Sequence, residues 1–159
     1  MTFFDLLKEL EQKMGIKFDL LTLEGRIEVQ KSVFLLKYFK SKGLMKYDFD
    51  IYLHGPYSAQ LAYEYLSKGR MKLRFAKSKD KIPDKTIEMM KQIILKDKDK
   101  PEEYIEFLEG LTTLLSLSQD FGGPDEALLK AITLKPYMED SIWEESIDFI
   151  KEKELWNYS

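Results

Sequence analysis

The chain holds a single histidine, His54, and no cysteine. A histidine that acts as a general base needs an acid to orient it and a nucleophile within reach. The surrounding stretch, LHGPYSAQLAYEYL, contains neither a G-x-S-x-G motif nor a cysteine nucleophile. The alternative is structural, because a neutral imidazole at the junction of a strand and a turn commonly bonds to nearby backbone groups. We therefore expect His54 to mark a corner, and His54→Gln to cost about 1 to 2 kcal/mol through a lost buried hydrogen bond.

Carboxylates gather in the stretch that contains Glu102, Glu103, Glu106 and Glu109. A hard metal ion needs further ligands that converge from other elements, so a solvated helix face is the simpler interpretation. Without cysteine, the chain forms neither disulfides nor thiolate metal clusters. It also lacks the glycine-rich loops G-x-x-x-x-G-K-[ST] and G-x-G-x-x-G that bind phosphates. We expect no metal, no cofactor and no enzymatic activity.

Charge is sorted along the chain, which a net charge of −3 conceals. Residues 1–24 hold 3 Lys against 5 acidic residues, residues 25–81 hold 13 Lys and Arg against 5, and residues 82–159 hold 9 Lys against 18. A basic middle followed by an acidic third indicates a strong local field and a polyanionic partner.

The most basic segment, residues 68–81, holds 7 Lys and Arg and 1 acidic residue. Its arginines, Arg70 and Arg74, present a planar fork that fits phosphate or guanine. A basic stripe of this kind is typical of nucleic-acid binding, and a solvated edge strand protected by charge is the alternative. The candidate DNA contacts are Arg70, Lys72, Arg74 and Lys77, with Gln60 and Tyr63 of the helix that precedes them.

Periodicity predicts the elements that position these residues. Helices are expected over residues 3–14, 25–43, 59–68, 83–97, 101–118, 121–135 and 137–156, and strands over 47–53 and 70–77. In the motif His54, Gly55, Pro56, Tyr57 and Ser58, we expect Gly55 and Pro56 to make the corner and Ser58 to cap the next helix. The last helix should be capped by Asp140 or Ser141.

These elements predict a mainly α fold of the α+β kind, a helical bundle with a small antiparallel sheet. We expect one domain over 1–159, with a basic, winged-helix-like half (1–81) and an acidic helical half (82–159). The order helix, strand, helix and basic strand favours the winged helix. A winged helix-turn-helix has two helices between its first strand and its wing, whereas this sequence shows one, at 58–68.

Two segments carry a family resemblance: VQKSVFLLKYFKSKGL, and, after an aromatic strand, YLHGPYSAQLAYEYL. This pattern, over residues 26–66, resembles the YwgA-like family of uncharacterised bacterial and archaeal proteins. It is more distantly similar to the SocA-type, or Panacea, antitoxin-associated domain. The resemblance implies a mainly helical fold with a small sheet and a regulatory or antitoxin-like role through partner binding. It implies a toxin partner where relatives are antitoxins, and it supplies no catalytic residues.

Two functions therefore stand as hypotheses. The first is a transcription regulator that binds DNA through the basic segment, and the second is a protein interaction module, an antitoxin or adaptor, with Tyr52, Tyr57 and Tyr63 as its contact patch. A homodimer is compatible with both. No apolar run approaches the roughly 18 residues of a membrane span, and the amino terminus does not read as a signal peptide, so we expect a cytoplasmic protein.

Overall fold

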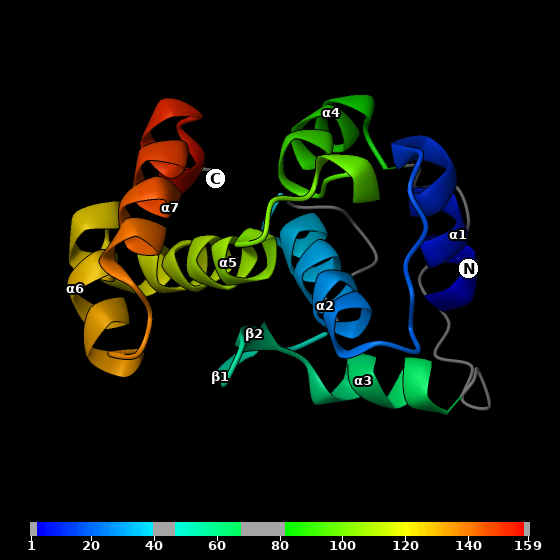
Figure 1. Ribbon diagram of the computed structural model, residues 1–159, viewed down its shortest axis with the longest axis horizontal. Coiled ribbons are helices and arrows are strands. Elements are labelled where there is room, and N and C mark those ends of the chain that lie inside the picture. Colours follow the sequence, from blue (N-terminus) through cyan, green and yellow to red (C-terminus); the bar gives the residue numbers. More distant parts are fainter. Residues whose placement is uncertain (1–2, 40–46, 68–81, 158–159) are drawn as a thin grey trace.

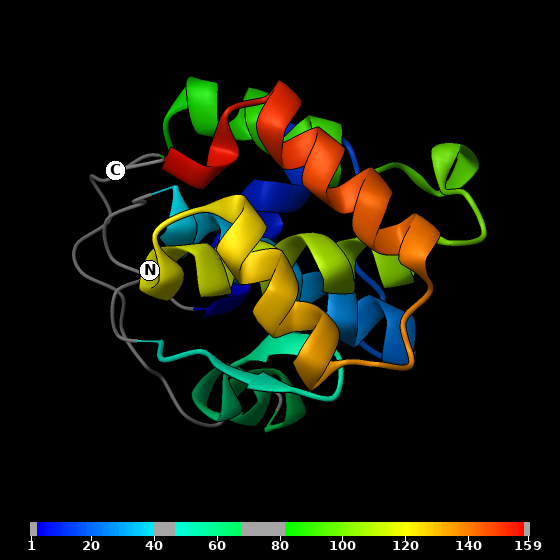
Figure 2. The same ribbon diagram turned by 90° about the vertical axis from the view of Figure 1, so that its left-hand side faces the viewer.

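Two long helices, α2 (Leu23–Tyr38) and α5 (Tyr104–Phe121), form the centre of the fold (Figures 1 and 2). The computed structural model describes residues 3–39, 47–67 and 82–157. The other elements are α1 (Phe3–Met14), β1 (Asp50–Tyr52), β2 (Gly55–Tyr57), α3 (Ala59–Leu66), α4 (Asp84–Ile93), α6 (Pro124–Leu134) and α7 (Asp140–Glu152), with short 3-10 helices η1 (Asp97–Asp99) and η2 (Leu155–Asn157). The prediction of a mainly helical fold with a small antiparallel sheet is confirmed.

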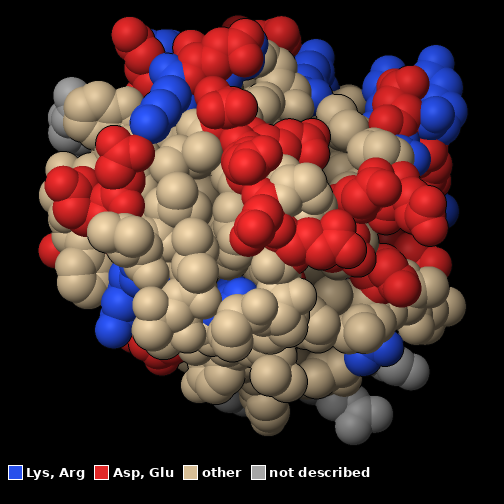
Figure 3. Space-filling view, turned by 60° about the vertical axis from the view of Figure 1, so that its left-hand side comes forward, with Lys and Arg blue, Asp and Glu red and all other residues tan. Residues whose placement is uncertain are grey.

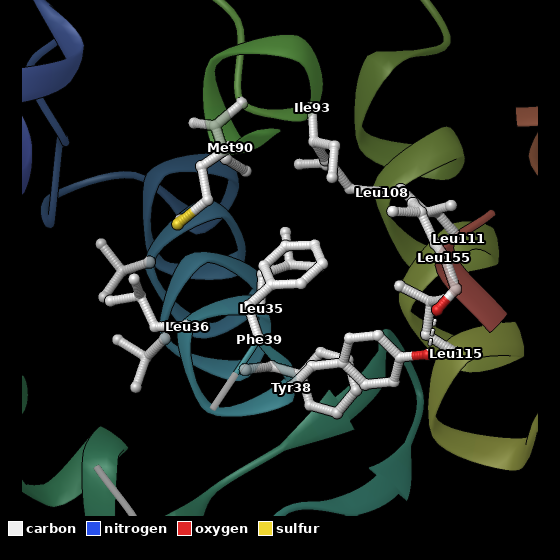
Figure 4. Close-up of a cluster of buried hydrophobic side chains, with 14 of the residues drawn as sticks. Leu35, Leu36, Tyr38, Phe39, Met90, Ile93, Leu108, Leu111, Leu115 and Leu155 are labelled. Carbon is white, nitrogen blue, oxygen red and sulfur yellow. Dashed lines mark hydrogen bonds between the residues drawn. The ribbon is translucent and has the colours of Figure 1, made fainter. Parts of the chain in front are cut away.

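The core lies where α2, α4 and α5 meet (Figure 4). Leu35 and Leu36 of α2 and Leu111 of α5 are wholly buried, and burial of such a side chain contributes about 1.5 to 3 kcal/mol. The Tyr38 hydroxyl donates a hydrogen bond to the carbonyl oxygen of Leu155, which fixes η2 against α2. The wide apolar arc of α2 in the sequence therefore reflects a helix surrounded by neighbours.

Helix starts follow side-chain caps in two places. The Ser58 hydroxyl accepts a hydrogen bond of 3.2 Å from the Leu61 N–H, as expected, and the Thr22 hydroxyl accepts one of 3.0 Å from the Gly25 N–H. The expected cap of α7 is wrong, because the residue before the helix is Glu139 and its side chain makes no capping bond. Asp140 lies inside the first turn, where its charge still complements the helix dipole.

The hairpin differs from the expected corner. β1 and β2 pair antiparallel, with Tyr52 opposite Gly55, so Leu53 and His54 form the two-residue turn. Gly55 and Pro56 belong to the second strand instead of making the corner. A two-stranded sheet has only edge strands, where proline is tolerated although it lacks an N–H.

The buried face of α3 also differs from the face that helical spacing predicts. Helical spacing over 59–68 predicts that Glu64 points outward. Its side chain is instead 1% exposed, and the Tyr47 hydroxyl donates a hydrogen bond of 2.6 Å to its carboxylate. The same spacing predicts that Leu66 is buried, but it is exposed, whereas Gln60 and Tyr63 are exposed as the spacing predicts. The wing expected over 70–77 lies outside the described residues, so the winged-helix comparison stays a prediction.

Candidate functional site

A cluster of polar side chains, three of them buried and one exposed, fixes the hairpin to the helices. Lys135, in the loop after α6, donates hydrogen bonds from Nζ to the carbonyl oxygens of Tyr52 (2.7 Å) and Leu53 (2.9 Å). The same Nζ pairs with the Glu109 carboxylate of α5 at 3.2 Å. The Tyr137 hydroxyl donates to the carbonyl oxygen of Leu53 at 2.8 Å. We call Lys31, Glu109, Lys135 and Tyr137 the hairpin clamp.

Lys31 is the member of the clamp that α2 contributes. Its side chain is 1% exposed, and its Nζ donates a hydrogen bond of 2.8 Å to the carbonyl oxygen of Pro56. Burial lowers the pKa of Lys31 to about 7, against the attraction of the Glu109 carboxylate, which raises it. A lysine with a lowered pKa is a better nucleophile than an ordinary one, but a side chain this buried is closed to a substrate. Its role is to hold the second strand of the hairpin.

Gly55 allows the hairpin to approach α5 closely. Its φ is +90°, a conformation that favours glycine, and a Cβ there would lie 2.9 Å from the Thr113 hydroxyl and 3.3 Å from the Glu109 carbonyl oxygen. The sequence singled out this glycine as a turn residue. The structure shows that it is needed for close packing of the hairpin on the helix.

His54 lies at the tip of the hairpin and is exposed. Its ring forms no hydrogen bond with the residues that the structure describes, so the premise of a buried hydrogen bond is wrong. A hairpin turn joins paired strands through its backbone, and the side chain of a turn residue is left to face solvent. His54 instead lines a pocket beside the turn.

That pocket, of about 580 Å³, lies between the hairpin turn, the start of α5 and the start of α7. Apolar side chains line it, among them Ile105, Met138 and Ile142, and the carboxylates of Glu103, Glu106 and Glu139 also face it. In the described part of the chain, no group of three or more His, Asp or Glu side chains is placed to hold a metal ion. Of the four glutamates that lie close together in the sequence, Glu109 is buried in the clamp, whereas Glu102, Glu103 and Glu106 are exposed.

The outer face of α6 is unusually apolar. The helix buries only two alanines, Ala127 and Ala131, whereas Leu129 is 72% exposed. The carboxyl-terminal end of α6 lies beside the hairpin turn (Figure 2), where Leu53 is 79% exposed. We call the exposed side chains here the hairpin–α6 surface; they are Tyr52, Leu53, Leu129, Ile132, Leu134 and Tyr137. Clustered apolar side chains on a surface are typical of interaction sites.

The expected DNA contacts Arg70, Lys72, Arg74 and Lys77 lie outside the described residues. Within residues 25–81, the described part holds 3 Lys and Arg and 4 acidic residues, so the positive excess is carried by 40–46 and 68–81. Its cations bond to backbone: Arg26 to the carbonyl oxygen of Thr22, Lys31 to that of Pro56 and Lys37 to that of Tyr47. Gln60 and Tyr63 are exposed on α3.

Comparison with known proteins returned no match: no family model, no curated protein and no solved structure is significantly similar to the chain. The resemblance to YwgA-like proteins therefore stays a prediction. Among the described helices, none is both long and apolar enough to cross a membrane.

Proposed function

We propose that the chain is a regulatory protein that acts by binding another protein through the hairpin–α6 surface. The observation that carries this proposal is the packing of α6, which contacts the core through two alanines and the partly buried Leu128. Its other large apolar side chains are exposed; they are Leu129, Ile132 and Leu134. In a helix that only served the fold, the large apolar residues would face the core. An antitoxin or an adaptor would both use such a face, and no catalytic group is required.

The hairpin clamp supports the proposal because it makes the surface rigid. Three hydrogen bonds from Lys135 and Tyr137 fix the backbone carbonyls of the hairpin tip, so Leu53 and Tyr52 are already placed for contact. A preorganised surface loses less entropy on binding, at about 0.5 to 1.5 kcal/mol for each side chain that would otherwise be immobilised. The exposed tyrosines Tyr52 and Tyr137 are of the residue type that dominates binding hot spots.

The test is purification of the tagged full chain from its native host after nuclease treatment. The comparison is between the unchanged chain, the double variant Leu53→Ser and Leu129→Gln, and the control Leu21→Ser. Leu21 is 90% exposed in the link between α1 and α2, so its substitution removes an exposed leucine away from the hairpin–α6 surface. We expect a stoichiometric protein partner that the double variant loses and the control retains. A chain that carries no such partner, or a partner indifferent to the double variant, contradicts the proposal.

A second candidate function, DNA binding in transcription regulation, is supported by charge. The segments 40–46 and 68–81 carry 10 Lys and Arg against 1 acidic residue, and Gln60 and Tyr63 are exposed on the helix that precedes the second segment. Titration of a mixed-sequence duplex at two salt concentrations tests it. Four phosphate contacts predict a log–log slope of about −3 to −4, which should shrink in the variant Arg70→Ala, Arg74→Ala. Binding that ignores salt, or none at micromolar protein, removes this candidate.

A further inference from the structure

We infer that the pocket beside the hairpin turn receives the side chain of an arginine or lysine from the protein partner. The inference rests on the proposed function, because the pocket adjoins the surface that the partner would cover. Leu53 and Tyr137 belong both to the hairpin–α6 surface and to the lining of the pocket. A partner seated on that surface therefore lies over the mouth of the pocket.

The rim of the pocket attracts a cation. Glu103, Glu106 and Glu139 are exposed, and none of them forms an ion pair with the residues that the structure describes. The buried cation Lys135 is already paired with Glu109 and bonded to two backbone carbonyls of the hairpin. Figure 3 shows acidic side chains gathered across one part of this face and a largely uncharged area beside them.

The helix dipoles reduce this negative charge without cancelling it. Glu103 and Glu139 stand at the N-terminal ends of α5 and α7, and each such end carries about half a positive charge. Against three carboxylates, two half charges leave the rim negative. The carboxylates therefore serve partly to complement the helix ends and partly to attract an external cation.

The interior of the pocket selects the kind of cation. Ile105, Met138 and Ile142 offer apolar contact to the methylene stem of a long basic side chain, whose charged head stays at the carboxylate rim. A bare metal ion fits poorly, because no group of carboxylates in the described ranges converges to ligate one. Charge-assisted hydrogen bonds of a guanidinium or ammonium to carboxylate are about twice as strong as neutral ones. The partner surface is thus apolar with a basic anchor.

The probe for this inference is N-acetyl-argininamide, and its control is the neutral isostere N-acetyl-citrullinamide. Both are titrated into the full chain at constant ionic strength, and the methyl resonances of Ile105, Met138 and Ile142 are followed by NMR. We expect saturable shifts with argininamide, and at least tenfold weaker binding of citrullinamide. The variant Glu106→Gln, Glu139→Gln should weaken argininamide at least fivefold, and both positions are exposed, so folding is preserved.

The matched control variant is Glu126→Gln, Glu152→Gln, which removes two exposed carboxylates. Glu126 lies at the start of α6 and Glu152 at the end of α7, and neither lines the pocket. It should leave the affinity unchanged. Equal binding of the two probes, shifts that do not saturate, or equal affinities in the two double variants would overturn the inference.

The inference and the proposed function fail separately. A partner complex that is lost in the variant Leu53→Ser, Leu129→Gln but unaffected by Glu106→Gln, Glu139→Gln keeps the proposed function and removes the basic anchor. A second copy of the chain as the partner would appear as a dimer in light scattering. Its contact should then weaken in both double variants, which supports the inference; a dimer weakened only by the leucine variant contradicts it.

Discussion

Lys31 Nζ lies 2.8 Å from the carbonyl oxygen of Pro56, and this buried hydrogen bond joins α2 to the second strand of the hairpin. The fold thus holds its exposed hairpin through a lysine that is removed from water. Burial lowers the pKa of that lysine to about 7, although Glu109 opposes the shift. The free energy needed to keep this amine in the core depends on its protonation, and the stability of the chain should therefore depend on pH.

Stability should rise with pH above neutrality because of Lys31. Its pKa is about 7 in the folded chain and 10.5 in the unfolded chain, so between these values the unfolded state binds more protons. The free energy of unfolding therefore increases with pH in this window, by at most about 1.4 kcal/mol per pH unit from this group. Urea unfolding at pH 7, 8 and 9 measures the slope, and Lys31→Met should flatten it.

The control for that measurement is Lys85→Met. Lys85 is exposed on α4 and forms no hydrogen bond or ion pair within the described residues, so its replacement should leave the slope as it is. Equal slopes in the unchanged chain and in Lys31→Met would show that the amine is not desolvated in solution.

Gln30 should be essential to stability. Its amide donates a hydrogen bond of 2.9 Å to the Ser58 carbonyl oxygen and accepts one of 2.9 Å from the Ser58 N–H, both buried. Gln30→Met leaves the buried Ser58 N–H without a partner, whereas the Ser58 carbonyl oxygen still accepts a hydrogen bond of 3.0 Å from the Ala62 N–H. We expect a loss of about 1 to 3 kcal/mol in chemical unfolding. The exposed Gln92→Met should change stability by less than about 0.5 kcal/mol, and similar losses in the two variants would refute this account of Ser58.

Gly25 is required by close packing. A Cβ at this position would lie 1.6 Å from the carbonyl oxygen of Asp19, a backbone atom that cannot rotate away. Gly25→Ala should therefore destabilise the chain by about 3 kcal/mol, as overpacking does. At Gly123 a Cβ would meet only the flexible carboxylate of Glu126, so Gly123→Ala should cost less than about 1 kcal/mol. Thermal unfolding of the two variants compares them directly, and an equal loss would contradict the packing.

His54→Gln should leave stability within about 0.5 kcal/mol, because the side chain is exposed at the hairpin turn. This replaces the larger effect expected from the sequence. Chemical unfolding measures it, and a loss of 1 kcal/mol or more would show that the ring has a structural partner after all.

The sequence predicted the helices well because their signals are local. The apolar spacing in α1 and the hydroxyl of Ser58 before α3 depend on neighbours within one or two turns. Helical spacing wrongly predicts an exposed Glu64, because the burial of this side chain depends on a hydrogen bond from Tyr47, which lies outside α3. Tertiary hydrogen bonds of this kind leave no periodic signal.

The candidate site was predicted only in part. The motif containing His54 and Gly55 was singled out, yet the clamp residue Lys135 could not be, because a lysine that bonds carbonyls 82 and 83 residues away looks like any surface lysine. The exposed apolar face of α6 could have been predicted from the sequence. Ala127 and Ala131 recur at helical spacing while Leu129 falls between them, which indicates a helix that buries its small side.

The most direct test of the proposed interaction is the affinity of the purified partner for three forms of the chain, measured by calorimetry. We expect the variant Leu53→Ser, Leu129→Gln to bind about 30-fold more weakly than the unchanged chain, a loss of about 2 kcal/mol that is typical of hot-spot residues. Leu21→Ser should bind within twofold. Equal affinity in all three forms would contradict the claim that the hairpin–α6 surface is the binding site.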